Sequence, residues 1–243
     1  QEADLAGIEP HRAVVMFLGE QNSWSYNSSL SAQQLLDEAI EKAAIQDPAR
    51  WQLLSFRSAS TCPAYQISNV ARPVPGGETR QAAVAGRFYP GSEEELWPLI
   101  DTLIGDLPAE KQACPAVMVP HAGLVYSGKL AADVLKEVQI PATVIILSPK
   151  HTRLGVPWAV APCQAWSLPG VTISSDRELA EKLVAQIDGL ELDAAAHEQE
   201  HGIEVELPLL ARLAPESQAV GIAIGEANME QCKQLGSQLA GVL

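Results

Sequence analysis

The sequence predicts an α/β protein with a mostly parallel sheet and helices on both of its faces, joined to a small N-terminal α/β segment. Beyond about residue 75, short apolar runs alternate with amphipathic segments, which is typical of a parallel sheet covered by helices. Hydrophobic residues make up 47% of the 243 residues and charged residues 19%, which is enough for a buried core. The formal net charge of −14 disfavours nucleic acid and anionic membranes as partners, so we expect neither.

The N-terminal part is predicted to be a small accessory segment. Ser31 has the character of a helix N-cap, and the helix that follows is expected to end at Asp47-Pro48. Two prolines and two glycines among polar residues in 68–80 predict a linker, so we expect an accessory segment at 1–75 and a larger domain at 76–243. In the accessory segment we also expect a strand at 11–17, a polar edge segment at 19–27 and a strand at 51–60.

The larger domain is predicted to repeat strand and helix. Glu204 and Glu206 alternate with apolar residues and are expected to lie on an exposed helix face. The last helical pattern reaches Leu243 without a stop signal and the chain begins at Gln1, so we expect a fragment of a longer polypeptide. The predicted helices are 92–104, 128–138, 176–186, 201–213 and 229–243, and the predicted strands are 116–119, 143–147, 158–161 and 218–224.

The cysteines and the apolar runs indicate a cytoplasmic protein. Four cysteines lie about fifty residues or more apart without a CxxC pair, which favours reduced thiols over a disulfide framework. The apolar runs are far shorter than the roughly 20 residues that a membrane-spanning helix needs. The four cysteines are Cys62, Cys114, Cys163 and Cys232.

Two histidines each follow a predicted strand. His121 stands after the run ending in Val119-Pro120, and His151 after the run ending in Pro149-Lys150. Ligands of open parallel sheets bind beyond the carboxyl ends of the strands, so both histidines are expected at the site. Neutral imidazole is a ligand for iron, zinc, copper and nickel, and the preceding prolines stiffen both loops.

A third histidine cluster allows several interpretations. His197 and His201 are four residues apart with Glu198 directly after the first, as in the HExxH zinc motif of metalloproteases. The flanking residues are weakly apolar and Gly202 follows at once, which is atypical of a core-packed zinc helix. An acidic, solvated loop is the second interpretation, and a third is that His201 is a polar residue of the same pocket as His121 and His151.

Taken together, four motifs in order resemble the Memo family, whose bacterial and archaeal members are called AmmeMemoRadiSam system protein B. The resemblance covers about residues 80 to 243. The motifs are Ala83-Val84-Ala85-Gly86-Arg87-Phe88-Tyr89-Pro90, Val119-Pro120-His121-Ala122-Gly123 with Tyr126-Ser127-Gly128, Leu147-Ser148-Pro149-Lys150-His151, and Glu200-His201-Gly202-Ile203-Glu204 with Leu207-Pro208.

The resemblance implies a fold like that of class III extradiol dioxygenases with a site for iron or copper. His121 and His151 match the two histidines that ligate metal in the family, and His201 matches a histidine that lines the pocket, expected here as a catalytic residue. The family pattern continues with an Asp and a His on a later strand and then a cysteine, which lie beyond Leu243. About the last third of the domain is therefore expected to be missing, which leaves the metal site incomplete.

The resemblance also implies partners. The segment around Leu35-Leu36, Asp47-Pro48 and 51–56 looks like part of the AMMECR-like protein of the same system, although an unrelated accessory fold is an alternative. AMMECR-like and radical-SAM proteins are thus expected partners, with a small molecule or a peptide in the pocket. The leading hypothesis is a metal-dependent oxidoreductase, and the alternative is a non-catalytic protein that binds a peptide or partner.

Overall fold

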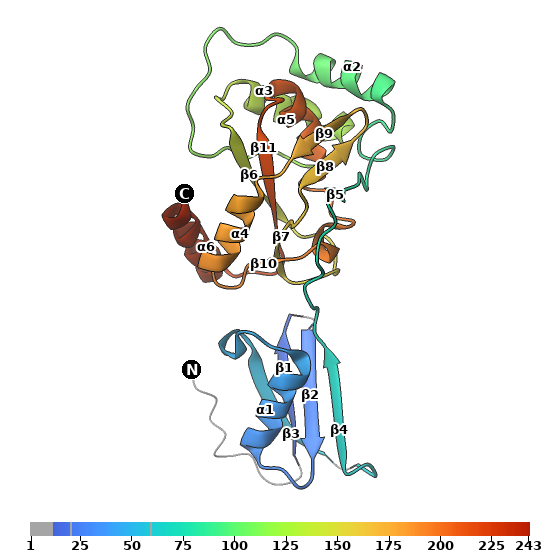
Figure 1. Ribbon diagram of the computed structural model, residues 1–243, viewed down its shortest axis with the longest axis vertical. Coiled ribbons are helices and arrows are strands. Elements are labelled where there is room, and N and C mark those ends of the chain that lie inside the picture. Colours follow the sequence, from blue (N-terminus) through green and yellow to red (C-terminus); the bar gives the residue numbers. More distant parts are fainter. Residues whose placement is uncertain (1–11, 20, 59) are drawn as a thin grey trace. The chain divides into compact units, whose positions relative to one another are not determined.

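The computed structural model describes residues 12–19, 21–58 and 60–243 (Figure 1). The chain divides into two compact units, 1–72 and 73–243. The division falls within the run of prolines and glycines at 68–80. The predicted start of the first strand, residue 11, lies outside the described residues. Among the described helices, none combines the length and the apolar character needed to cross a membrane.

The N-terminal unit is a four-stranded antiparallel sheet with one helix, α1 (Ala32–Ala43), against it. Ser31 caps α1, as the sequence predicts, and the structure adds a capping box with Gln34. Met16 packs with Ala39 and Ala43 of the helix, which fixes the helix to one face of the sheet. The strands are β1 (Arg12–Leu18), β2 (Gln21–Asn27), β3 (Gln52–Arg57) and β4 (Ala64–Asn69), in the order β3-β1-β2-β4, with a 3-10 turn at Pro48–Arg50.

The second unit contains a mixed sheet of order β10-β7-β11-β6. Strand β11 (Gln218–Ile224) is parallel to β6 (Thr143–Pro149) and antiparallel to β7 (Trp158–Val160), which is parallel to the short β10 (Glu191–Leu192). The sheet is therefore not uniformly parallel, because β7 runs against β11. A separate three-stranded sheet is formed by β5 (Thr79–Arg80), β8 (Ala165–Leu168) and β9 (Val171–Ser174).

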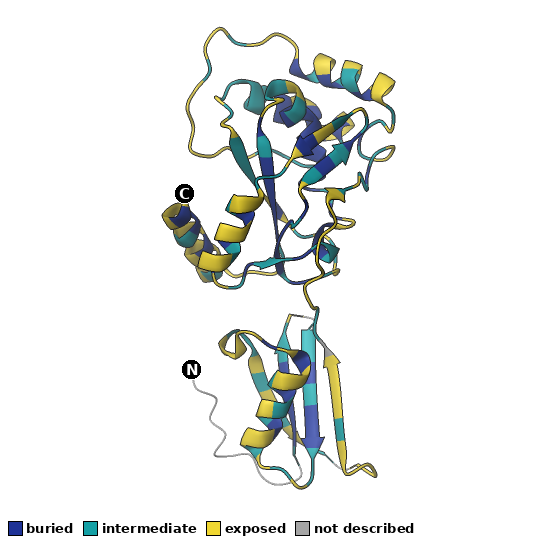
Figure 2. Cartoon of the chain, viewed as in Figure 1, coloured by how far each residue is buried: buried dark blue, intermediate teal, exposed yellow. Residues whose placement is uncertain are grey.

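Helices pack on both faces of β11, whose residues are buried along nearly the whole strand (Figure 2). Ala219 and Ala223 belong to an apolar cluster with α2, α3 and α5, whereas Val220 and Ile222 belong to a second cluster with α4 and α6. This alternation is expected for a strand covered on two faces. The helices are α2 (Glu93–Ile104), α3 (Leu124–Lys136), α4 (Arg177–Gln186), α5 (Leu207–Leu213) and α6 (Met229–Val242).

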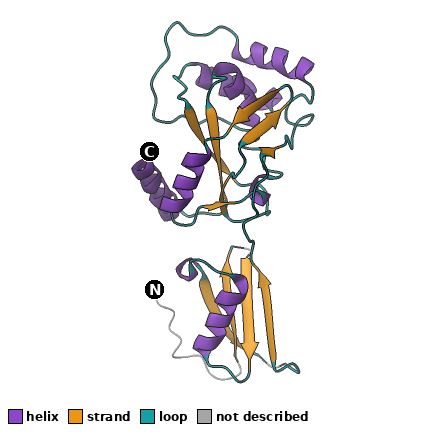
Figure 3. Ribbon diagram, viewed as in Figure 1, coloured by secondary structure: helices purple, strands orange, loops and turns teal. Residues whose placement is uncertain are grey.

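The predicted strand at 116–119 does not form. The residues between α2 and α3 are a loop (Figure 3), and Val117 and Met118 are 42% and 92% exposed. An apolar run becomes a strand only when a neighbouring strand takes up its backbone hydrogen bonds, and no described strand pairs with this run.

The predicted helix at 201–213 is shorter than expected. Glu204–Glu206 form a 3-10 turn and α5 begins at Leu207, with Pro208 in its first turn, where its missing N–H costs no hydrogen bond. The predicted exposure of Glu204 and Glu206 is wrong, because both side chains are buried. Alternation with apolar residues misleads at Glu204 because donors from residues 80–89 surround its buried carboxylate. Glu206 is buried although its Oε2 has no hydrogen-bond partner among the described residues.

Candidate metal centre

Three histidines from separate loops meet beside the end of β6. His121 precedes α3, His151 follows β6, and His201 precedes the 3-10 turn at Glu204–Glu206. One ring nitrogen of each lies within 4.8 Å of the others, so the group can hold a metal ion. We call these three residues the histidine cluster.

The two post-strand histidines have the spacing of two ligands of one ion. His121 Nε2 lies 3.3 Å from His151 Nε2, and the ring centroids are 5.1 Å apart. Two nitrogens that each lie 2.0–2.1 Å from one tetrahedral ion are about 3.3–3.4 Å apart. The donor set, neutral imidazole, suits iron, copper, zinc and nickel, so the residues present fit a transition metal ion.

A buried carboxylate orients one of these ligands. Glu200, 1% exposed, accepts hydrogen bonds from His151 Nδ1 at 2.7 Å and from the backbone N–H groups of His151, His201 and Gly202 at 2.6–3.0 Å. Because His151 Nδ1 carries the donated hydrogen, its Nε2 lone pair faces His121. Burial alone would raise the pKa of Glu200, but the bonds from Gly202 and His151 outweigh it and lower that pKa.

The other two histidines are held in the neutral form that a metal ligand or a proton acceptor requires. Burial, followed by the nearby His151, lowers the pKa of His121 and of His201. Phe88 packs against His201 with ring centroids 4.5 Å apart. His201 Nδ1 lies 3.7 Å from Glu200, too far for a hydrogen bond, so Glu200 does not fix the tautomer of His201.

A second buried carboxylate fixes the loop that carries Glu200 and His201. Glu204, 0% exposed, pairs with the Arg80 guanidinium and accepts bonds from the backbone N–H groups of Ala83 and Val84 and from the Tyr89 hydroxyl. Arg80 also donates to the carbonyl oxygens of His197 and Glu200. The segment that carries Phe88 and the loop that carries His201 are therefore bound together.

His197 is not part of the cluster, so the HExxH interpretation is wrong. Its side chain is 1% exposed, Nε2 lies 3.2 Å from the carbonyl oxygen of Ala159, and its ring meets the edge of Trp166. Burial lowers the pKa of His197 to about 4. The solvated-loop interpretation holds for Glu198 and Gln199, which are exposed, and fails for His197 and Glu200, which are both buried. A single helix does not span this stretch, so His197 and His201 do not share a helix face.

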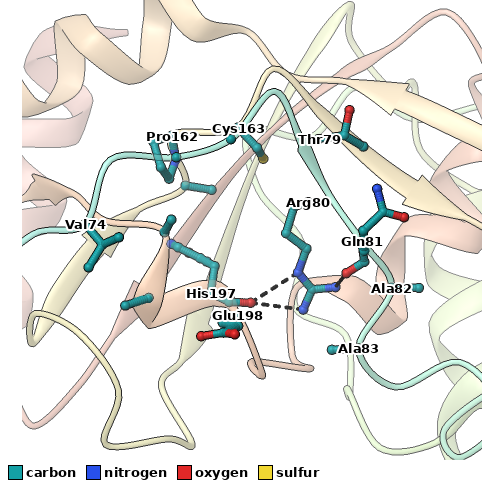
Figure 4. A pocket seen from close by; sticks show the side chains of 15 residues that line it. Val74, Thr79, Arg80, Gln81, Ala82, Ala83, Pro162, Cys163, His197 and Glu198 are labelled. Atoms are coloured by element: carbon teal, nitrogen blue, oxygen red, sulfur yellow. Dashed lines mark hydrogen bonds between the residues drawn. The ribbon is translucent and has the colours of Figure 1, made fainter.

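A cavity of about 550 Å³ lies beside His197 and Glu198, at the start of the loop that leads to His201 (Figure 4). Arg80 and His197 line it, and Figure 4 shows the guanidinium bonded to the His197 carbonyl oxygen. All five N–H groups of Arg80 are used, on Gln81, His197, Glu200 and Glu204. The arginine therefore offers this cavity no free donor for a ligand.

Sequence reasoning identified the three histidines and missed the residues that orient them. Glu200 lies inside one of the four motifs that resemble the Memo family, and Arg80 lies at the end of the predicted linker. A usable signal for Glu200 is its position next to a histidine and just ahead of the apolar run that begins at Ile203. Nothing local marks Arg80, because its partner Glu204 is 124 residues away.

Comparison with known proteins shows what the second unit is similar to. The sequence model of a family described as Memo-like protein matches residues 80–243. A MEMO1 family protein of Aquifex aeolicus is 42% identical over 165 residues, which are 68% of this chain and 61% of the relative. MEMO1 family proteins of Thermococcus onnurineus and Methanopyrus kandleri are 38% and 36% identical, over 66% and 67% of this chain and 58% and 62% of the relatives. The chain thus spans about three fifths of the length of these relatives.

Proposed function

The chain belongs to the Memo family, and on that premise we propose that it binds a redox-active transition metal ion, iron or copper, through His121 and His151. His201 acts in the same proposal as the acid–base residue of the site. The observation that carries the proposal is the pair of Nε2 atoms 3.3 Å apart, one of them oriented by the Glu200 carboxylate.

The residues of the chain divide the work of such a site. A bound iron or copper ion supplies Lewis-acid and one-electron chemistry. Glu200 holds His151 in the tautomer that presents Nε2. His201 lies beside both proposed ligands and its ring forms no hydrogen bond with Glu200, so the ring can take a proton from a substrate or return one. Phe88 forms an apolar wall against His201.

Metal analysis after anaerobic purification tests the assignment. We expect one equivalent of iron or copper in the wild type and loss of that metal in His121→Ala and in His151→Ala. His201→Asn should retain the metal if His201 is the acid–base residue, whereas loss of metal would make it a third ligand. His197→Gln is the matched control, because His197 has its ring nitrogen on a backbone carbonyl and lies outside the cluster.

The result that would overturn this function is stoichiometric metal in both alanine variants, or none in a folded wild type. The second outcome favours the non-catalytic alternative, a binding site for a peptide or partner. The observation that favours that alternative is apolar exposure near the cluster, since Met118 and Tyr126 are 92% and 87% exposed.

A further inference from the structure

We propose that Gly202 and Ser148 are positioning residues that together set the place of the loop carrying His201 against the rest of the histidine cluster. The hydroxyl group of Ser148 fills the space that a side chain at position 202 would need. Both residues act through their neighbours and not on a bound molecule. The inference rests on the proposed function only where a metal ion serves as the readout.

Gly202 is buried and lies between the parts of the site. Its backbone N–H group donates to Glu200 Oε1 at 3.0 Å, and the same oxygen accepts the bond from His151 Nδ1. A Cβ atom added to Gly202 would lie 3.5 Å from His121 Cδ2. Gly202 is therefore bonded to the orienting carboxylate and lies beside a proposed metal ligand.

The space around position 202, and not its backbone conformation, requires a glycine. The φ angle of Gly202 lies outside the left-handed region that favours glycine. A methyl group at this position would overlap the Ser148 hydroxyl group. It would also lie 3.2 Å from Ser148 Cβ, which is closer than carbon atoms normally pack. The side chain of Ser148 and any side chain at 202 thus compete for one space.

Ser148 is held in place by the sheet and by its own hydrogen bond. It is 4% exposed near the end of β6 and pairs with Ala223 of β11. Its hydroxyl group donates to the carbonyl oxygen of Pro149 at 3.0 Å. Rotating the side chain away from Gly202 would break that bond, which is unfavourable for a buried hydroxyl group. A side chain at 202 is therefore expected to displace the loop and not Ser148.

Displacing Gly202 would alter the site through Glu200. Oε1 of Glu200 accepts bonds from the backbone N–H groups of His201 and Gly202 as well as from His151 Nδ1. Two residues further on, the Glu204 carboxylate is fixed by four donors from another segment, so the loop cannot shift as a whole. The displacement therefore falls on the side of the loop that faces the histidine cluster.

Substitutions at the two positions, alone and combined, test the proposal on the whole chain. Gly202→Ala adds the methyl group, and Ser148→Gly removes the side chain that the methyl group would overlap. In the double variant, the nearest remaining contact is His121 Cδ2 at 3.5 Å, an ordinary packing distance. Gly236→Ala in α6 is the matched control, because a Cβ atom at Gly236 would meet nothing within 4 Å.

Amide hydrogen exchange in the presence of a chelator is the readout without metal. The His151 N–H group donates to Glu200 Oε2 at 2.6 Å, whereas the neighbouring Lys150 N–H group donates to Ile224 O of β11 at 2.7 Å. We expect Gly202→Ala to speed exchange of the His151 amide at least about tenfold and to leave the Lys150 amide within about threefold of the wild type. A general loss of stability would instead speed both amides.

Competition between the protein and a chelator for Cu²⁺ alone is the readout with metal. Gly202→Ala should weaken Cu²⁺ binding at least about tenfold, because it disturbs the carboxylate that orients His151. The double variant should bind within about threefold of the wild type, since the effects of two residues in contact are not additive. Ser148→Gly alone and Gly236→Ala should also stay within about threefold, because neither removes a group that is bonded to the histidine cluster.

Two outcomes overturn the proposal. One is a Gly202→Ala variant whose His151 exchange matches the wild type, and the other is a double variant no closer to the wild type than Gly202→Ala. If Gly202→Ala does not fold, a folded double variant with wild-type His151 exchange supports the proposal, and a double variant that also fails to fold overturns it. Absence of Cu²⁺ binding by the wild type would refute the proposed function, whereas the exchange data would still decide the positioning role.

Discussion

Replacing Glu206 by Gln should stabilise the second unit, and the gain should grow with pH. Glu206 is 7% exposed and its Oε2 has no hydrogen-bond partner among the described residues. Burial raises its pKa from 4.5 to about 8. The folded state therefore holds a proton that the unfolded state releases above pH 4.5, so the carboxyl lowers the free energy of unfolding as pH rises.

The size of the effect follows from those two pKa values. The rise of the pKa from 4.5 to about 8 lowers the free energy of unfolding of the wild type by roughly 5 kcal/mol between those two pH values. Of this loss, roughly 3 kcal/mol falls between pH 4.5 and 7. Glu206→Gln keeps the shape of the side chain and cannot ionise. The difference between variant and wild type should therefore rise by about 1.4 kcal/mol per pH unit up to about pH 8 and then level off.

Urea denaturation at several values between pH 5 and 9 measures this difference. The amide signal of Val220, 2% exposed in β11, is a suitable probe, because the two compact units can unfold separately. Comparing variant with wild type at each pH cancels the other titrating groups. A difference that stays constant between pH 5 and 8 would refute the assignment of a neutral, buried Glu206.

Three further predictions concern buried polar groups. Burial lowers the pKa of His197 to about 4, so the free energy of unfolding of the wild type should fall by roughly 3 kcal/mol as pH falls from 6.5 through 4. In urea denaturation, His197→Gln should show a smaller fall over the same pH range. Glu200→Gln should weaken metal binding about 10–100-fold in a competition titration with a chelator, and unchanged affinity would remove its orienting role. Arg80→Met leaves the Glu204 carboxylate buried without its cation, so we expect a loss of about 3–5 kcal/mol in urea denaturation, and a loss below about 1 kcal/mol would contradict the role of this pair.

Local patterns predicted the described α-helices and about half of the described strands. The apolar runs at 143–147 and 218–224 are β6 and β11, and Ser31 caps α1 as expected. These elements were predictable because capping and periodicity act within a few residues. Strands β4, β5, β8, β9 and β10 were missed, since all but β4 are only two to four residues long and β4 runs into the proline- and glycine-rich stretch at 68–80. The place of β4 is set by its pairing with β2.

The parts that were mispredicted depend on distant residues. The run at 116–119 has the composition of a strand but finds no neighbour among the described strands, and β7 runs against β11, which no local pattern signals. The exposure predicted for Glu204 failed because its donors come from residues 80–89.

Part of the candidate site could be predicted from the sequence, because its histidines follow local apolar runs. His121 and His151 were identified from their position after apolar runs, and the structure brings both together with His201. Whether His121 and His151 ligate metal and His201 acts as an acid–base residue stays a prediction. The orienting role of Glu200 follows from the tertiary fold, because Glu200 contacts His151 from 49 residues away along the chain.

The long separation between Arg80 and Glu204 has a consequence for synthesis on the ribosome. At about 5–20 residues per second, the 124 residues between them take roughly 6–25 s to be made. The four strands of the N-terminal unit are complete before Arg80 is translated, so that unit can fold while the second unit is still emerging. In the last part of that interval, once residue 151 has been made, the nascent chain carries His121 and His151 but not Glu200. The carboxylate that orients the proposed metal ligand His151 is therefore made after both histidines, so the proposed site cannot take its final geometry until the loop at 197–204 has left the exit tunnel.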